Sequence, residues 1–448
     1  MDSSRLADRL RGILKVPAPK APGASGQLSG AAGSRDRAEL ADVLGGRWCE
    51  AEGLSCFVVE RRREPTSRYG SQPVGAIAAS LLDGAADAPL IAGGTPTRPP
   101  FVFFDLETTG LSGGAGTYAF LVGCGAFDEE GGFRTRQFLL VRPSDERQVL
   151  QRLAVELAPA GGLVTFNGKS FDAPLIETRY LFHRLEWTGR LLPHLDVLHP
   201  ARRFWGADDG VGNSCSLGAL EQHVLGVRRA DDVPGADIPA RYFQFVRSGD
   251  GEPLAQVLEH NRLDLLSLAG LTARLFDLLR RGPGAVRRPR EALALGRAYA
   301  EGGLDSRARA AYEQAMAMGT LSESGRVEAL RSLALLARRA RRYDAAAAHW
   351  RAVLDVETVS CQAAREASEA LAIHHEHRAR DLRTAKAFAL RCLEGNEMTR
   401  ETAWNQAVRH RLARLEKKMD ASAQPKLFPS SPSRPSSGFP MSARRTSS

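Results

Sequence analysis

Two acidic residues interrupt the most strand-like stretch of the sequence, FVFFDLETTG at residues 101 to 110. Asp105 and Glu107 are two residues apart, so a β-strand would place both carboxylates on one face, a few ångströms from each other. Two like charges that close repel and raise each other's pKa unless a cation lies between them. Divalent ions such as Mg²⁺ prefer carboxylate oxygens. The pair therefore predicts either a metal site or a strand end whose acids face water.

Two further segments place acids among apolar residues. VTFNGKSFDAPLI ends a second apolar strand and delivers Asp172 where the chain turns into a helix. In LEHNRLDLL, His260 and Asp264 are four residues apart and share one face of a helix. The leucines around Asp264 make its surroundings costly for an unpaired carboxylate. Four acids on three hydrophobic elements need a shared counter-charge, and we expect Mg²⁺ or Mn²⁺ to supply it.

A pair of such ions predicts phosphodiester hydrolysis. Two divalent ions about 3.5 to 4 Å apart activate a water and stabilise the leaving oxygen of an in-line displacement. We expect His260 to be the general base for that water, because the intrinsic pKa of histidine, about 6.5, suits proton transfer near neutral pH. A packed or solvated histidine is the alternative.

From residue 99 onward, strand-like and helical runs alternate. PFVFFDLET, TYAFLVGCGAF and FRTRQFLLVRP predict three strands joined by Gly-rich or acidic turns. A helix over SDERQVLQRLAVELA, a strand over GLVTFNG, a helix over APLIETRYLFHRL and a strand over HLDVLHPA follow. This order predicts an α/β fold, a ribonuclease-H-like mixed sheet flanked by helices. Leu and Val at spacings of three and four over 254 to 280 predict a long buried helix.

Residues from about 99 to 280 resemble a DEDD-type 3′-to-5′ exonuclease of the ribonuclease-H-like superfamily. DLETTG resembles the first motif of that family, NGKSFD the second and HNRLD the third. Within that family, the chain most resembles the predicted YprB-type exonuclease subgroup. The segments that carry this likeness are GTYAFLVG, LVTFNGKSFD, HLDVLHPARRFW and EHNRLDLLSL. The first motif alone would be weak, whereas the three together are specific.

The resemblance implies roles for individual residues. The metal ligands and catalytic acids would be Asp105, Glu107, Asp172 and Asp264. The residue that orients the attacking water would be His260. The substrate-binding residues would be Thr108, Thr109, Gly110, Asn167 and Lys169. Turn formation explains Asn167 equally well.

One spacing departs from the family pattern. Members with a histidine as base usually have five positions from His to the last Asp, whereas here the step from His260 to Asp264 is four, as in the branch that uses tyrosine. The pattern therefore supports the four carboxylates more strongly than the base. Asp196, in PHLDVLHP, is a further acid on an apolar strand that either supports the site or caps a turn.

Basic and aromatic residues follow the second motif. The arginines either line a groove for a nucleic-acid strand or belong to a solvated surface; they are Arg202, Arg203, Arg228, Arg229 and Arg241. Phe204 and Trp205, beside two of them, are candidates for stacking on a base. A place in the core is the alternative for Trp205.

The nuclease domain is expected over 96–282. Residues 1–95, which include the linker VPAPKAPGASGQLSGAAGSR, predict a flexible or poorly defined N-terminal region. Residues 419–448 are rich in Ser and Pro and predict a disordered tail.

A helical repeat domain is expected over 290–418, after the basic linker RRGPGAVRRPR. Segments that begin with EAL at 291, 328 and 369 resemble one another, at offsets of 37 and 41. These offsets are near the period of tetratricopeptide-type helix pairs, about 34. A plain helical bundle is the alternative.

Charge and cysteine content bear on partners and compartment. The formal net charge is +9, and 54 of the 61 basic residues are Arg, which fits either polyanion binding or a GC-rich genome. Six scattered cysteines indicate neither a disulfide framework nor a zinc module. The sequence has no secretory signal pattern and no apolar run near the roughly 18 residues of a membrane span. We therefore expect a cytoplasmic protein without a membrane partner.

These features predict a metal-dependent nuclease acting on DNA or RNA. The family resemblance implies that it releases nucleoside monophosphates from a 3′ end, which we expect to be single-stranded. The helical repeats would bind a protein partner or guide the substrate. One alternative is a non-catalytic nucleic-acid-binding scaffold that acts through its repeats. Another is a structure-specific endonuclease, because the metal chemistry fixes which bond breaks but not where along a strand.

Overall fold

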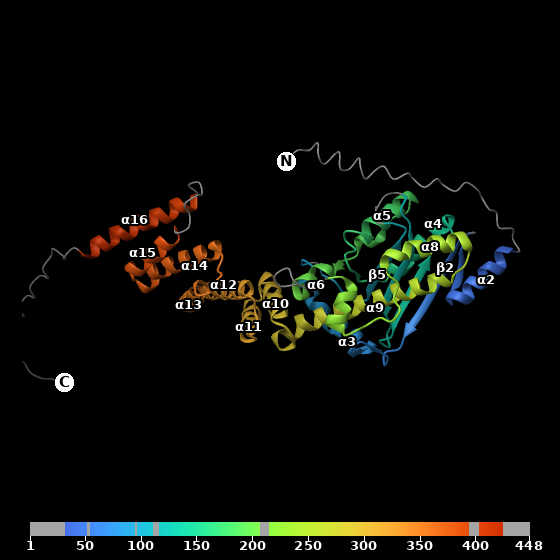
Figure 1. The fold of residues 1–448 in the computed structure, drawn as a ribbon, viewed down its shortest axis with the longest axis horizontal. Helices are drawn as coiled ribbons and strands as arrows, with labels where there is room; N and C mark the ends of the chain where they lie inside the picture. The colour runs from blue at the N-terminus through green and yellow to red at the C-terminus, as the bar shows by residue number, and fades with distance from the viewer. Residues whose placement is uncertain are drawn as a thin grey trace, which may run out of the picture.

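The computed structural model describes residues 32–51, 54–94, 96–110, 116–206, 215–393 and 403–423. An α/β part is followed by a row of helices that extends away from it (Figure 1). The expected fold class, a mixed sheet flanked by helices with a helical region after it, is confirmed. Most of the expected tail and the first 31 residues lie outside the described ranges. Within those ranges, no helix combines the length and apolar character needed to cross a bilayer.

Seven strands form the main sheet, in the order β1-β2-β7-β6-β5-β8-β9. β5 lies inside the sheet, antiparallel to β6 and parallel to β8. The strands are β1 Arg47–Ala51, β2 Leu54–Arg63, β5 Phe101–Thr108, β6 Ala119–Phe127, β7 Phe133–Leu139, β8 Gly162–Thr165 and β9 His194–Asp196, and a separate hairpin pairs β3 Arg68–Tyr69 with β4 Gln72–Pro73.

The sheet begins earlier in the sequence than expected. β1 and β2 fall within the region predicted to be poorly defined, yet β2 pairs with β7 from Phe57↔Leu139 to Arg63↔Phe133. The expected boundary at residue 96 therefore divides one sheet. The Arg-rich β2 acquires its position only from pairing with a strand 70 to 82 residues later in the sequence, from Arg63↔Phe133 to Phe57↔Leu139, which local patterning does not report. The expected strand over HLDVLHPA is also shorter, because helix α6 (Leu198–Trp205) begins just after Asp196.

Alternation along β5 assigns its residues to the two faces of the sheet. Phe101 and Phe103 share a core cluster with residues of α9 (Glu252–Arg281) and α3 (Val74–Gly84). Val102, Phe104 and Leu106 share the opposite cluster with α4 (Glu146–Leu157), α5 (Asp172–Phe182) and α8 (Ile238–Ser248). Because side chains two apart face the same way, Asp105 and Glu107 continue the row of Phe101 and Phe103. Both acids therefore project on the face that α9 covers. α2 (Ala32–Leu44) contributes Leu40 and Leu44 to the opposite cluster.

Helices fill the C-terminal part. Three successive helix pairs match the three EAL segments: α10 Pro289–Glu301 with α11 Asp305–Ala317, α12 Glu323–Arg339 with α13 Tyr343–Leu354, and α14 Cys361–His374 with α15 Leu382–Arg391. α16 (Ala403–Ala423) follows. Tyr312 and Trp350 are buried on the second helices of their pairs. The tetratricopeptide type of these pairs stays a prediction, as do the domain limits at 282, 290 and 418.

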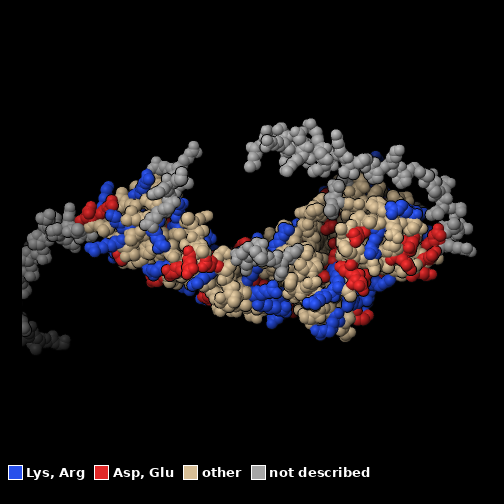
Figure 2. Space-filling model, in the orientation of Figure 1, with Lys and Arg blue, Asp and Glu red and all other residues tan. Residues whose placement is uncertain are grey.

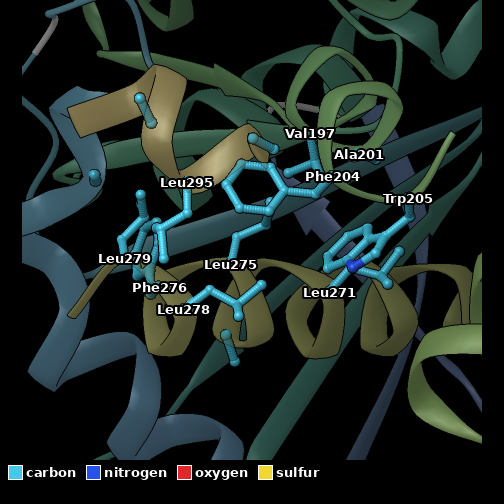
Figure 3. Packing of buried hydrophobic residues seen from close by; sticks show 14 of the residues in the cluster. Val197, Ala201, Phe204, Trp205, Leu271, Leu275, Phe276, Leu278, Leu279 and Leu295 are labelled. Carbon is cyan, nitrogen blue, oxygen red and sulfur yellow. The ribbon is translucent and has the colours of Figure 1, made fainter. Parts of the chain in front are cut away.

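A shared hydrophobic core joins the two parts (Figure 3). Leu271, Leu275 and Leu278 of α9 pack with Leu295 of α10 and with the aromatic rings of α6, Phe204 and Trp205.

A polar contact crosses the same junction, where Trp205 Nε1 donates to Glu291 Oε1 at 2.9 Å and Arg274 Nη2 lies 3.2 Å from Glu291 Oε2. Trp205 is thus a core residue, and with Phe204 at 1 % exposure neither ring is available to stack on a base. The basic linker lies at a packed junction.

Leu275→Ala tests the junction, because Leu275 is fully buried between the two parts. We expect the variant to lose about 2–5 kcal/mol of unfolding free energy, since a large-to-small change in a core leaves a cavity. The urea midpoint followed by tryptophan fluorescence measures this. The control is Leu82→Ala, at a leucine that is 63 % exposed, which should stay within about 0.5 kcal/mol. Equal midpoints for both variants would contradict the shared core.

Candidate active site

The C-terminal end of β5 carries the two acids of the first motif. Asp105 and Glu107 are half-buried there, and the pairing of β5 with β6 shifts register between Glu107 and Thr108. The threonines that follow Glu107 form hydrogen bonds with backbone groups near the end of the strand. Thr109 exchanges hydrogen bonds with Tyr118, because its N–H donates to the Tyr118 carbonyl and its Oγ1 accepts from the Tyr118 N–H, both at 3.0 Å. Thr108 Oγ1 donates to the Gly110 carbonyl at 3.1 Å.

The acids of the three motifs act on one another electrostatically. Burial, followed by the negative charges of Asp264, Glu107 and Asp172, raises the pKa of Asp105 well above its ordinary value. Burial and the charges of Asp264 and Asp172 raise the pKa of Glu107 to about 8. Burial, together with Asp196, raises the pKa of Asp172 to about 7. β5, α5 and α9 thus bring the four predicted carboxylates into one region.

Asp264 has a cationic partner within the protein. Arg229 contacts Asp264 and the buried Glu221, and its Nη1 lies 3.1 Å from Asp232 Oδ2. Burial opposes the charge of Arg229, yet the hydrogen bond to Glu221 and the charge of Asp264 raise the pKa of Arg229. With its side chain only 8 % exposed, Arg229 does not line a groove.

His260 is oriented by an acid that the sequence did not reveal. Its Nδ1 lies 2.7 Å from Asp232 Oδ1, and its Nε2 lies 3.6 Å from Asp264 Oδ2. Burial opposes the negative charge of Asp232, but the hydrogen bond from His260 leaves the pKa of Asp232 below its ordinary value. Asp232 lies in the irregular segment before α8, where spacing gives no signal for a partner of His260.

Asn261 is the other contributor that the motifs left unassigned. Its Nδ2 donates to Asp105 Oδ2 at 2.8 Å, and its Oδ1 accepts from Gln137 Nε2 at 2.9 Å. Both amides are buried, at 0 % and 1 % exposure. Sheet register aligns this network, because Gly123 on β6 pairs with both Asp105 and Gln137. A Cβ at Gly123 would lie 2.2 Å from Asn261 Oδ1, so only glycine leaves room for the amide.

Asp196 holds the loop of the second motif. Its carboxylate accepts hydrogen bonds from the N–H of Asn167 at 2.7 Å, of Lys169 at 3.1 Å and of Leu198 at 3.1 Å. Asn167 has a φ of 67°, in the left-handed region that asparagine tolerates in turns. Asp196 is therefore a turn-stabilising residue, and Asn167 serves the turn through its backbone. The Lys169 side chain is exposed, and Asp172 is the first residue of α5.

The remaining arginines of the proposed groove lie on different elements. Arg202 and Arg203 are exposed on α6, Arg228 is exposed in the segment before α8, and Arg241 on α8 donates to Gln256 Oε1 at 2.5 Å. Arg203 pairs with Glu301 of α10 at 3.1 Å. Of the five, Arg229 alone is placed by this structure at the carboxylates.

Divalent ions fit the donor set by its chemistry. Asp105, Glu107 and Asp172 are half-buried oxygen donors whose raised pKa values show that nearby positive charge does not offset their repulsion. In the described ranges, no three His, Cys, Asp or Glu side chains lie close enough together to hold an ion as they stand. The contact from Arg229 engages Asp264. Binding an ion through all four acids would therefore require their side chains to move.

Residues 102–276 match the family model described as the RNase_H superfamily. This segment forms an RNase H-like domain. A stretch of 174 residues is also 41% identical to "Uncharacterized protein YprB" of Bacillus subtilis (strain 168), and it spans 38% of this chain and 40% of that protein. The matched segment includes α5, nearly all of β5 and most of α9, the three elements that carry the four carboxylates.

The raised carboxylate pKa values predict that the protein loses stability as pH rises in the absence of metal. Glu107 has an ordinary pKa of 4.5 and a folded value of about 8, so the folded state binds more protons than the unfolded state between these values. Unfolding free energy must therefore fall with increasing pH across this window. We expect the melting temperature in EDTA to decrease between about pH 5 and about pH 9. Glu107→Gln should make the decrease smaller, and an identical decrease in the variant would contradict the assignment.

Asn261→Ala should weaken metal binding at the site, because it removes the amide that donates a hydrogen bond to Asp105. We expect the Mn²⁺ affinity measured by titration calorimetry to fall by about 10-fold or more, as when partners of metal ligands are removed. Gly123→Ala should act in the same direction by displacing the Asn261 amide. Gly218→Ala is the matched control, since a Cβ there meets nothing within 4 Å. Unchanged Mn²⁺ affinity in both site variants would contradict the role of the network.

Proposed function

We propose that this protein is a metal-dependent 3′-to-5′ exonuclease that hydrolyses phosphodiester bonds of DNA or RNA by a two-metal mechanism. The observation that carries the proposal is the mutual electrostatic effect of carboxylates from β5, α5 and α9, which raises the pKa values of Asp105, Glu107 and Asp172. A protein that only binds nucleic acid gains nothing from acids that repel phosphate. The RNase H-like match supports the same chemistry.

Asp105, Glu107, Asp172 and Asp264 would hold the ions. Bound divalent cations supply charge neutralisation at the phosphate and at the leaving oxygen. Asn261 keeps the Asp105 carboxylate on the face toward α9. Arg229 compensates the charge of Asp264 until an ion is bound, and Glu221 holds Arg229 in place.

His260 would take the proton of the attacking water. Asp232 accepts from His260 Nδ1, which fixes the ring and leaves Nε2 directed toward the carboxylates. Water would add to phosphorus while the bond to the 3′ oxygen breaks, so that the terminal nucleoside monophosphate departs and the 3′ oxygen of the shortened strand takes up a proton to become a hydroxyl. The pairing of His260 with Asp232 supports the base assignment despite the four-residue step to Asp264.

The loops of the first and second motifs would bind the 3′ end of the substrate strand. Thr108 ends β5 beside the acids and Thr109 and Gly110 follow it, and the backbone groups of these residues that are not hydrogen-bonded within the protein would face the terminal nucleotide. The exposed Lys169 would contact a phosphate, whereas Asn167 contributes its turn. We propose that the C-terminal helices bind a protein partner or guide the strand, and that the protein acts in the cytoplasm.

A labelled-strand assay tests the proposal. Wild-type protein with Mg²⁺ or Mn²⁺ should shorten a 5′-labelled single strand from its 3′ end as a ladder, and EDTA should stop it. Asp105→Asn should lower the rate about 100-fold or more, which is about 2.7 kcal/mol at 1.36 kcal/mol per decade. Glu129→Gln, at an exposed acid in the turn after β6, is the control.

Each alternative gives a distinct result in the same assay. Internal fragments without a ladder would assign a structure-specific endonuclease. Binding without any shortening would assign a non-catalytic scaffold. Either result would overturn the exonuclease proposal.

A further inference from the structure

An arginine-lined cavity lies where the RNase H-like domain meets the helix pairs. It has a volume of about 100 Å³ and is lined by residues of α6, α10, the loop before α12 and α12 itself: Arg203, Arg290, Leu293, Arg297, Ser322, Ser324, Gly325 and Glu328. Its volume equals that of about three waters at ~30 Å³ each, which is enough for one phosphate group. In Figure 2, blue side chains gather along this stretch between the two parts.

The lining favours an anion. Three arginines and one glutamate line the cavity, and Glu301 pairs with one of these arginines from outside the lining, so positive charge still exceeds negative charge there, three against two. Glu328 is engaged by both Nε and Nη2 of Arg297. Arg203 is 48 % exposed and pairs with Glu301, itself 59 % exposed, at 3.1 Å. Such an exposed pair contributes only about 0–1 kcal/mol. A phosphate can therefore replace Glu301 as the partner of the Arg203 guanidinium with little loss of free energy.

The walls of the cavity are fixed. Arg290 Nε and Nη2 donate to the carbonyls of Arg203 and Arg202 at 3.3 and 3.0 Å, which ties α10 to the C-terminal end of α6. Ser322 Oγ accepts from the Gly325 N–H at 3.2 Å, and Ser324 Oγ lies 3.1 Å from Ser322 Oγ. One of these hydroxyls donates to the other, so one hydroxyl remains able to donate into the cavity without rearrangement of the backbone.

The position of the cavity favours a nucleic-acid strand as its occupant. α6 begins at Leu198, whose N–H is bound by the same Asp196 carboxylate that fixes the loop of Lys169, and it ends beside Arg203. The five-residue step from Leu198 to Arg203 rises about 7.5 Å along the helix. At about 3.4 Å per stacked nucleotide, that rise corresponds to about two nucleotides.

We propose that this cavity binds a backbone phosphate of the substrate strand a few nucleotides from the cleaved end, with Arg203 as the principal contact. This inference rests on the proposed function for its substrate. It gives the first two helix pairs a direct part in holding the strand, because α10 and α12 supply six of the eight residues that line the cavity. Arginine suits the role, since its planar fork binds phosphate through two parallel hydrogen bonds.

The test measures binding without hydrolysis. Anisotropy of a fluorescein-labelled single strand, titrated with the full-length protein in EDTA, gives Kd over a range of salt concentrations. Arg203→Ala should weaken binding about threefold or more and lower the salt slope by about 0.7, the value of one phosphate contact on a single strand. Arg391→Ala removes an exposed arginine from the third helix pair as the matched control.

A second variant separates binding from folding. Ser324→Asp places a negative charge in the cavity, yet it lies in the first turn of α12, where an acid stabilises the helix. The melting temperature should be unchanged or higher while Kd rises about threefold or more.

Three results decide the inference. Wild-type affinity in both cavity variants, or weakening no greater than that of Arg391→Ala, would overturn it. Weakened binding of a polyglutamate peptide with unchanged oligonucleotide binding would assign the cavity to an acidic protein partner instead. Because the assay contains no metal, a loss of oligonucleotide affinity would stand even if the nuclease assay failed.

Discussion

The rest of the structure depends on one constraint, the repulsion between negatively charged carboxylates at the end of the buried strand β5. The alternation of β5 continues the row of Phe101 and Phe103 as Asp105 and Glu107, so the acids project from the core face under α9. Asp172 and Asp264 add to the same repulsion. Burial of this kind is stable only when hydrogen bonds and opposite charges compensate it.

Two devices compensate this charge within the protein. Beneath Asp105, the amides of Asn261 and Gln137 form a buried network that crosses the sheet through the space left by Gly123. Beside Asp264, Arg229 supplies a positive charge and is itself held by Glu221. The first device positions one carboxylate permanently. The second engages another carboxylate through an ion pair.

The long helix α9 links this site to the C-terminal helices. Its N-terminal half carries His260, Asn261 and Asp264, and its C-terminal half forms the core shared with α6 and α10 (Figure 3). The site and the helix pairs are therefore built on one continuous element. A strand held at the junction would be held at a fixed distance from the carboxylates.

The sequence by itself determined the α/β class, the strands β5 to β8, the helices α4, α5 and α9 and the acids that these elements bring into one region, because period-two and helical patterns report local burial. It could not place β1 and β2 beside β7, because that register arises from pairing between distant segments. Nor could it find Asp232 and Gln137, or assign Asn261 its contact, because their partners lie 28 to 156 residues away. Only tertiary structure decided that Arg229 belongs to the acids and Trp205 to the core, because side-chain burial depends on what packs above each residue.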